Sequence, residues 1–509
     1  MKRNQRTIGL TISYINMIIS MAVNFLLTPM MIHSLSDDGY SIYKIMRSLA
    51  GPLIILNLGV STVVARSIVR FSENAETIDA KENTYALGTL LSFITGILVM
   101  GVGAIISSFI PALYENSFSP ESLVMAKEMF LIFSATTAIH IMTESFRGCV
   151  IGHEKFIFSH SSHTVQHILR FSLICVLLAK GRSALSVAYV DLIVSAVILG
   201  GYFLFSRFLL REKMKLSQFD RTVFSQFASF SFAILLQAIV NQVNNNIDII
   251  ILGAKVSSAE VITMYSSALT IYSVYNSLLS SIPGLYLPQA MKLVARNATG
   301  EELTDFVIKP GRYQTMLAVG IVCGFAVTGR SFIDLWIGNE YADAYYVALF
   351  LMIPVTIPLI ENVAITILDA NLKRVYRSVV LCAMAIINIV LTLMLIPIFG
   401  FWGALVATCI SLVIGHIILM NVYYHKVMGM NVFRMFKSML KGTLSSGIIS
   451  ALLIAPLSFL ITNNVVSFLV QGTLFVIIYA LMLFFRCLSS VERKTAINKL
   501  HLNFLRNNQ

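Results

Sequence analysis

Long apolar runs recur from one end of the chain to the other and limit its fold more than any other feature of the sequence. The hydrocarbon core of a bilayer is about 30 Å thick, and a helix needs about 20 apolar residues to cross it. Fourteen runs reach that length, approximately 8–32, 39–63, 85–110, 123–145, 161–179, 186–206, 223–253, 262–288, 313–333, 346–368, 378–398, 401–423, 442–461 and 466–485. Only 12% of the 509 residues are charged, against about 25% in ordinary soluble proteins. The sequence therefore predicts an all-α polytopic membrane protein with 14 transmembrane helices.

The distribution of lysine and arginine predicts how the chain is oriented in the membrane. With the N-terminus in the cytoplasm, most of the 37 Lys and Arg residues fall in inner segments, whereas the outer loops hold Lys180, Arg182 and Lys255. Cytoplasmic loops of membrane proteins carry such an excess of positive charge. Both termini are therefore expected in the cytoplasm. The net charge of +12 is then an orientation signal, and no nucleic-acid partner is expected.

Short matches between the two halves of the chain predict an internal repeat. The matched residues follow the same order in both halves: Tyr43 with Tyr265, Lys155 with Lys373, and Gly181 with Gly400. We expect a six-helix N-terminal lobe at 1–222, a six-helix C-terminal lobe at 223–441 related to it by pseudo-two-fold symmetry, and an extra helix hairpin with a cytoplasmic tail at 442–509. Such parallel repeats are typical of carriers that rock two bundles about a shared site.

Polar side chains at membrane depth are the candidates for function, because an ionised group there costs about 2.5 to 3.5 kcal/mol and normally faces a hydrated cavity. In the fifth run, His160, His163, His167 and Arg170 share one helical face at 3.6 residues per turn. We assign Arg170, His163 and His167 to a central substrate-binding cavity. The alternative is that the outermost histidines lie at the headgroup boundary and only Arg170 is deep.

The first helix of each lobe carries amides that suit the same cavity. Asn16 and Asn24 share one side of the first run, and Asn241 and Asn245 crowd one side of the seventh. Amides also hold membrane helices together, at about 0.6 to 2 kcal/mol each. Binding of substrate and interhelical bonding therefore both remain open for them.

Three deep carboxylates and one further arginine complete the set. Glu144, Asp248 and Glu361 suit a proton or sodium relay, because neighbouring charges and burial tune the protonation of such groups. Ion pairing, for example of Glu144 with Arg147 or Arg170, is the alternative. Arg47 is too deep in the second run for snorkelling to explain it well, so we place it in the substrate cavity.

No catalytic residue, metal site or organic cofactor is predicted. The six cysteines lie singly without a CxxC spacing, and His163 and His167 have no further ligands at the spacing that zinc requires. The sequence holds no GxxxxGK[ST] motif, so self-contained ATP drive is excluded. A proton or a sodium ion is therefore the coupling species to expect, if one is used.

The chain resembles the multidrug/oligosaccharidyl-lipid/polysaccharide exporter superfamily, and within it the polysaccharide-unit flippases of the O-antigen, or Wzx, type. The resemblance covers the whole chain and rests on its twelve-plus-two helix plan and on short motifs: Leu58-Gly59-Val60-Ser61 with Arg66, Asn246 with Asp248 and Gly253, Leu287-Pro288, and Phe399-Gly400-Phe401-Trp402-Gly403-Ala404.

The resemblance implies a flippase that moves an undecaprenyl-pyrophosphate-linked oligosaccharide, such as an O-antigen repeat unit, from the cytoplasmic to the periplasmic leaflet. It implies alternating access, driven by membrane potential, ion counterflow or both, in the bacterial inner membrane. Family members bind the anionic headgroup with basic residues of a central cavity, and Arg47 and Arg170 fit that role. A polysaccharide polymerase and a chain-length regulator are the implied protein partners.

Three other functions remain as alternatives. A cation-coupled multidrug antiporter would need deep acidic residues, including one in the first helix, where this chain has none. A lipid II flippase would have a denser basic cavity with a first-helix arginine. An enzyme such as an O-antigen polymerase would need a large outer loop, and the outer connections at 111–122 and 334–345 are short. A flippase of polysaccharide units is therefore the favoured interpretation.

Overall fold

The computed structural model describes residues 2–57, 59–71, 78–216, 242, 244, 246–256, 258–371, 374–461 and 463–494. Within these ranges, ten helices are long and apolar enough to cross a membrane. An eleventh span forms if α12 (Ala344–Ile360) and α13 (Val363–Ala370), which meet at an angle of 47°, count as one. The predicted all-α membrane-spanning fold is confirmed, while the predicted run at 223–253 lies mostly outside the described residues.

The chain divides into two compact units. Unit 1 comprises Met1–Ser267 and Asn388–Ala404, and unit 2 comprises Ala268–Ile387 and Leu405–Gln509. The expected lobe boundary between residues 222 and 223 lies outside the described residues, as does most of the C-terminal tail. The sequence repeat therefore stays a prediction.

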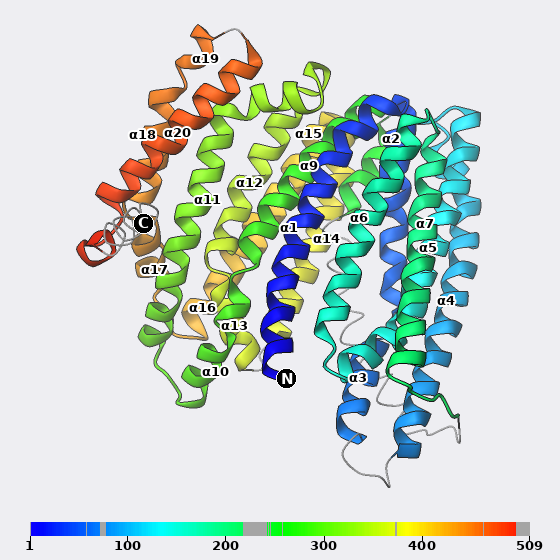
Figure 1. Cartoon of the computed structure of the whole chain (residues 1–509). Helices are drawn as coiled ribbons and strands as arrows, with labels where there is room; N and C mark the ends of the chain where they lie inside the picture. Colours follow the sequence, from blue (N-terminus) through cyan, green and yellow to red (C-terminus); the bar gives the residue numbers. More distant parts are fainter. Residues whose placement is uncertain are drawn as a thin grey trace, which may run out of the picture. The chain divides into compact units, whose positions relative to one another are not determined.

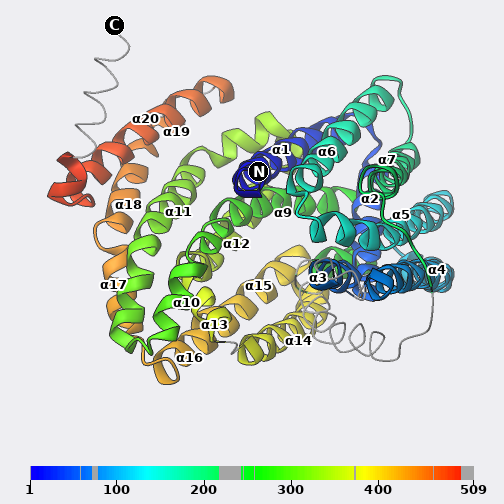
Figure 2. The same cartoon turned by 60° about the horizontal axis from the view of Figure 1, so that its bottom comes forward.

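Unit 1 is a bundle of long helices (Figures 1 and 2). Its elements are α1 (Lys2–Ser34), α2 (Asp37–Ala50), the 3-10 turn η1 (Gly51–Leu56), α3 (Val60–Phe71), α4 (Ile78–Tyr114), α5 (Pro120–Gly152), α6 (Phe156–Ala179), α7 (Ala184–Leu204) and the π-helical turn η3 (Phe205–Leu209). Helix α5 packs against α2, α3, α4 and α7, and α6 packs against α1 and α7. The helix α9 (Ala259–Ser280) begins in this unit and continues into unit 2.

Local sequence explains where several of these helices begin and bend. The side chain of Ser119 accepts a hydrogen bond from the backbone N–H of Ser122, and Pro120 occupies the first turn of α5, where its missing N–H costs nothing. The second predicted run is broken between α2 and α3, because Gly51 and Pro52 replace regular helix with a 3-10 turn.

Two glycines of α5 let α3 approach closely. A Cβ atom on Gly148 would lie 2.6 Å from the backbone oxygen of Ser61, and one on Gly152 would lie 2.8 Å from the Cβ of Ile68. Small residues allow membrane helices to pack backbone to backbone in this way. The contact anchors an apolar core that includes Val64, Ile68, Phe146, Cys149 and Tyr202.

Unit 2 is organised about α11 (Gly300–Trp336). Its other elements are η4 (Pro283–Leu285), α10 (Leu287–Ala295), η5 (Asn339–Tyr341), α12, α13, the first part of α14 (Arg374–Phe399), most of α15 (Phe401–Leu412), the π-helical η6 (Val413–Met420), α16 (Asn421–Lys426), α17 (Val432–Leu440), α18 (Thr443–Ile454), α19 (Leu457–Leu460) and α20 (Asn464–Arg486). A capping box, in which Thr299 and Glu302 exchange hydrogen bonds, starts α11.

The C-terminal helices of unit 2 pack on α11, as both cartoons show (Figures 1 and 2). Phe475 and Tyr479 of α20 join Val319 and Ile454 in an apolar core. The Tyr479 hydroxyl donates a hydrogen bond of 2.8 Å to the backbone oxygen of Met316. This bond satisfies a phenol group that would otherwise be costly to bury.

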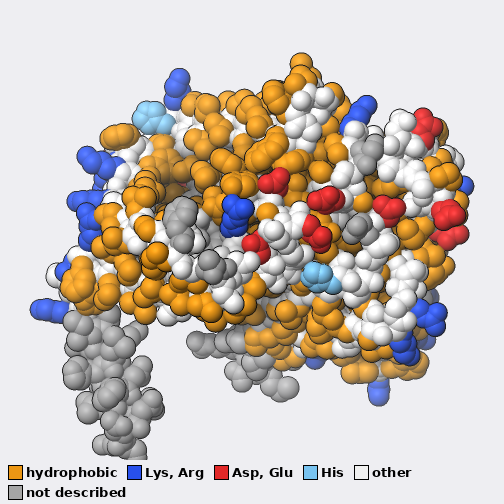
Figure 3. All heavy atoms as spheres, turned by 90° about the horizontal axis from the view of Figure 1, so that it is seen from above, with side chains coloured by type: hydrophobic (Ala, Val, Ile, Leu, Met, Phe, Trp, Pro, Cys, Tyr) orange, Lys and Arg blue, Asp and Glu red, His pale blue; other side chains and the backbone are white. Residues whose placement is uncertain are grey.

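Large apolar side chains on the outside of the helices suit a lipid solvent. Ile97 and Ile105 of α4 are 66% and 63% exposed, and Leu452 of α18 is 67% exposed. Hydrophobic side chains also cover much of the face drawn in Figure 3. Exposed apolar surface on this scale is not seen in soluble monomers, so the chain is a multi-pass membrane protein.

Candidate functional site

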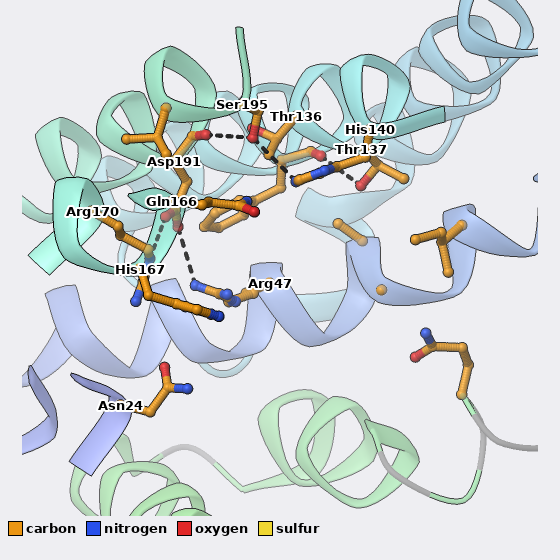
Figure 4. A pocket seen from close by; sticks show the side chains of 16 residues that line it. Asn24, Arg47, Thr136, Thr137, His140, Gln166, His167, Arg170, Asp191 and Ser195 are labelled. Carbon is orange, nitrogen blue, oxygen red and sulfur yellow. Dashed lines mark hydrogen bonds and ion pairs between the residues drawn. The ribbon is translucent and has the colours of Figure 1, made fainter. Parts of the chain in front are cut away.

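The candidate site is a polar cavity of about 280 Å³ within unit 1. Figure 4 shows polar side chains of several helices pointing into it. The lining residues are Asn24 of α1; Arg47 and Ala50 of α2; Gly51 and Ile54 of η1; Phe133, Thr136, Thr137 and His140 of α5; Gln166, His167 and Arg170 of α6; Asp191, Val194 and Ser195 of α7; and Gln242. The sequence predicts a central cavity shared by two lobes, whereas the residues that line this cavity all belong to unit 1. The predicted shared cavity stays a prediction.

Four side chains at one end of the cavity form a closed hydrogen-bonded group, which we call the arginine cluster: Tyr43, Arg47, Arg170 and Asp191 (Figure 4 labels the last three). Arg170 donates from Nε to Asp191 Oδ1 over 2.5 Å and from Nη2 to the Tyr43 hydroxyl over 2.7 Å. Tyr43 donates its own O–H to Asp191 Oδ2 over 3.0 Å. Arg47 donates from Nη1 to Asp191 Oδ2 over 3.1 Å and also to the Tyr43 hydroxyl.

Helix geometry explains why these residues meet. Tyr43 and Arg47 are four residues apart on α2 and therefore lie on one face of it. The Tyr43 ring is held in place by an edge-to-face contact with Phe133 of α5, at 5.4 Å between ring centroids. Arg170 and Asp191 come from α6 and α7, which pack directly against each other.

The two arginines of the cluster differ in what they offer to a ligand. The Arg170 side chain is 11% exposed and donates to the buried Asp191 and Tyr43, whereas the Arg47 side chain is 48% exposed. Both bonds of Arg47 use Nη1, so Nη2 and Nε are free of hydrogen bonds to the described residues. Asp191 neutralises one of the two cations. The cluster therefore carries one net positive charge, and Arg47 is the group that presents it.

The other polar groups of the cavity are uncharged or titratable, and Ile54, Phe133 and Val194 add apolar surface. His140 Nε2 lies 3.1 Å from Ser195 Oγ, which in turn donates to the backbone oxygen of Asp191. The hydroxyls of Thr136 and Thr137 donate to backbone oxygens one turn earlier in α5. Such hydroxyls can still accept hydrogen bonds from a ligand. The cavity thus has one end that can bind an anion, and hydroxyl, amide and imidazole groups line the part beside it.

The cavity collects part of the predicted substrate-binding set. Arg47, Arg170, His167 and Asn24 all line it. Asn16 and His163 are not among its lining residues. Asn241 and Asn245 lie outside the described residues.

None of the three carboxylates predicted for ion coupling is among the residues that line this cavity. Glu144 accepts a hydrogen bond of 3.2 Å from Arg147 on the next turn of α5. Asp248 is buried in unit 1 and accepts one of 3.0 Å from the Tyr265 hydroxyl.

Glu361, the third carboxylate, belongs to unit 2 and lies at the break between α12 and α13, where it is 2% exposed. Its Oε1 atom accepts a bond of 3.3 Å from Asn421, while Oε2 has no hydrogen-bond partner among the described residues. Because a buried carboxylate oxygen needs a donor or a cation, Glu361 is the strongest of the three candidates for holding an ion.

Sequence reasoning missed several residues that complete the cavity. Asp191, Tyr43, His140 and Gln166 are not among the site residues that the sequence predicts, although Asp191 and Tyr43 bond to both predicted arginines. The i, i+4 spacing of Tyr43 and Arg47 could have indicated that they share a face, but the identity of a partner on another helix leaves no periodic trace in the sequence.

The family of the chain follows from a comparison with protein-family models. Residues 7–295 match the model of the polysaccharide biosynthesis protein family, which is more than half of the chain. The chain belongs to this family. No curated protein matches it in sequence.

Solved structures with a similar fold include two transporters. The lipid II flippase MurJ, in an inward closed conformation, superposes with a TM-score of 0.71 at 16% identity, covering 94% of this chain and 98% of that one. An inward-facing multidrug resistance MATE family transporter of the MOP superfamily superposes with a TM-score of 0.56 at 12% identity, covering 81% and 99%. Together with the family match, this fold confirms the predicted superfamily. The fold of the chain is thus the fold of two transport proteins, and its family is that of polysaccharide biosynthesis proteins.

Proposed function

We propose that the chain is a flippase that moves an undecaprenyl-pyrophosphate-linked oligosaccharide, a repeat unit of a surface polysaccharide, from the cytoplasmic to the periplasmic leaflet of a bacterial inner membrane. The observation that carries the proposal is the cavity of unit 1, where the half-exposed Arg47 stands beside amides, hydroxyls and imidazoles. A guanidinium suits phosphate oxygens, because it donates parallel hydrogen bonds and stays charged. The neutral polar groups suit sugar hydroxyls.

The energetics of the substrate agree with this chemistry. A pyrophosphate and several sugars must be shielded from the hydrocarbon core, whereas the prenyl tail can stay in lipid. The match to a polysaccharide biosynthesis family supports a sugar-bearing substrate. The net positive charge of the arginine cluster argues against a cationic drug as the substrate, since like charges repel.

The proposal extends to the drive and the partners. An inside-negative potential favours outward movement of an anion by about 2.3 kcal/mol per charge per 100 mV. Counterflow of a proton or sodium ion through Glu361, with Glu144 and Asp248 as further candidates, would add to that drive. With its termini in the cytoplasm, the flippase would deliver its substrate to a polysaccharide polymerase and a chain-length regulator on the outer side.

A flipping assay on the purified chain tests the proposal. The chain is reconstituted into vesicles with a lipid-linked oligosaccharide, and the fraction of sugar that an external glycosidase can reach is followed over time. We expect the chain to move the lipid-linked oligosaccharide, and not a cationic dye, between leaflets. Transport of the dye without movement of the oligosaccharide would favour a multidrug antiporter instead.

A further inference from the structure

Asp191 is bonded to every other member of the arginine cluster. It is 8% exposed, its Oδ1 atom accepts from Arg170, and its Oδ2 atom accepts from both Tyr43 and Arg47. These bonds fix the carboxylate within reach of both guanidinium groups. An anion that entered the cavity would bind the open side of Arg47 and would meet the negative charge of this carboxylate beside it.

The Tyr43 hydroxyl creates a need for this carboxylate. Its oxygen accepts a hydrogen bond from each arginine, so two like charges are drawn to a single atom. Two cations held this close in a poorly solvated site repel each other strongly. Asp191 supplies the opposite charge between them, which lets both arginines keep their positions when no ligand is bound.

The same charge weakens the attraction for a ligand. With Asp191 ionised the cluster offers one net positive charge, carried mainly by the exposed Arg47, whereas without Asp191 it would offer two. A transported ion must bind firmly enough to enter a site and weakly enough to leave it. With Asp191 ionised, the exposed Arg47 still attracts an anion, while the lower net charge of the cluster lets the anion leave.

We propose that Asp191 is the internal counter-anion of the cavity: it positions Arg47 and Arg170 about the Tyr43 hydroxyl in the empty site and competes with the anionic headgroup of the substrate for their positive charge. This inference rests on the proposed function, and it names the residue that sets the affinity of the proposed site for the anionic headgroup. Asp191 is thus a positioning residue, which acts through the two arginines.

Binding of inorganic pyrophosphate to the full chain in nanodiscs, measured by calorimetry at fixed pH and salt, tests the role of Asp191. D191N should bind pyrophosphate about tenfold more tightly or better, since a carboxylate within hydrogen-bond distance of both guanidiniums opposes an incoming anion. E128Q, which removes one negative charge from an exposed position on α5, is the matched control and should bind like the parent chain. D191E should also keep the parent affinity, because it restores the charge.

A rescue experiment separates competition from a merely structural role, and it does not depend on the stability of D191N alone. R170Q leaves Asp191 to neutralise Arg47 and should weaken pyrophosphate binding. Adding D191N to R170Q leaves Arg47 as the single unopposed charge and should restore binding. If Asp191 only supported the fold, the second substitution would lower binding further.

The outcomes distinguish this inference from the proposed function. Tighter binding by D191N together with rescue of R170Q supports the inference. Binding by the parent chain that R47A abolishes, without tightening in D191N, overturns the inference and leaves the proposed function standing. Absence of pyrophosphate binding in every protein tested, the parent included, overturns both the inference and the anion site on which the proposed function rests.

Discussion

At the scale of single residues, the structure separates two arginines that the sequence treats alike. Arg47 and Arg170 are both deep and basic, and both line the cavity. Both arginines bond to Asp191 and Tyr43, but Arg170 uses two nitrogens and is 11% exposed, whereas Arg47 uses one nitrogen and is 48% exposed. Sequence pattern could place a cation at membrane depth, but it could not show which cation is already neutralised.

Substitution of Arg47 tests its role in transport. R47A should lower the rate of oligosaccharide flipping by at least about tenfold, the effect of losing about 1.4 kcal/mol of binding. R47K should retain part of the rate, because lysine keeps the charge but cannot make a bidentate contact with phosphate. The variant R182A, at an exposed position between α6 and α7, serves as a control with the same change in charge, and equal losses in R47A and R182A would contradict a specific role.

At the scale of helices, the apolar runs identified most spans, but their breaks and contacts needed the structure. The run at 39–63 is divided by η1, and the predicted run at 346–368 contains the bend between α12 and α13. Run length reports only that a segment is apolar enough to cross a membrane. Which faces of these helices touch depends on small residues whose partners lie far away in the chain.

The close contact of α3 and α5 leads to a prediction about stability. G148A should destabilise the chain by about 1 to 3 kcal/mol, the usual cost of overpacking, because the new Cβ would lie 2.6 Å from the Ser61 oxygen. G101A is the matched control, since a Cβ on Gly101 of α4 meets no atom within 4 Å. Thermal unfolding in detergent measures both variants, and equal melting temperatures would show that α3 moves away without cost.

A second prediction concerns Glu212, which lies in the segment after η3 and forms hydrogen bonds with residues of α4 and at the C-terminal end of α5. Its carboxylate accepts hydrogen bonds of 2.9 Å from Lys81 of α4 and 2.7 Å from His153 after α5. Burial raises the pKa of Glu212, but the hydrogen bonds from His153 and Lys81 outweigh that effect and hold the pKa below its ordinary value of 4.5. A carboxylate whose pKa is lowered by folding stabilises the fold above pH 4.5, and this contribution is lost as the pH falls through the folded value.

E212Q should therefore lower the stability of the chain at pH 7 by about 1 to 3 kcal/mol. The difference from the parent chain should shrink as the pH drops below 4.5. D79N, which removes an exposed carboxylate paired with Lys215 over 3.4 Å, should change stability little at either pH. A destabilisation by E212Q that stays constant down to acid pH would mean that the charge of Glu212 is not what holds the segment.

At the scale of the whole molecule, the family and the fold are shown by comparison, and the chemistry of unit 1 supports the proposed function. The membrane-spanning fold could be predicted from composition and run length, because the bilayer imposes both. The repeat, the lobe boundaries and the coupling ion could not be fixed in this way, since they depend on weak similarities and on proton positions.

The drive can be separated into its components in vesicles. Collapsing the potential while keeping the pH gradient should slow flipping if the anion moves down the electrical field, at about 2.3 kcal/mol per charge per 100 mV. E361Q should leave this dependence on potential intact and remove any acceleration by a pH gradient. Flipping that is unaffected by either gradient in the parent chain would contradict the proposed drive.

The most direct test of the central claim is a cryo-electron microscopy structure of the chain with a lipid-linked oligosaccharide bound. The claim predicts density for the pyrophosphate beside the open side of the Arg47 guanidinium, with the first sugars against the Thr136, His140 and Gln166 side of the cavity and the prenyl tail in lipid. Density for the headgroup anywhere else, with the cavity of unit 1 holding only water, would contradict it.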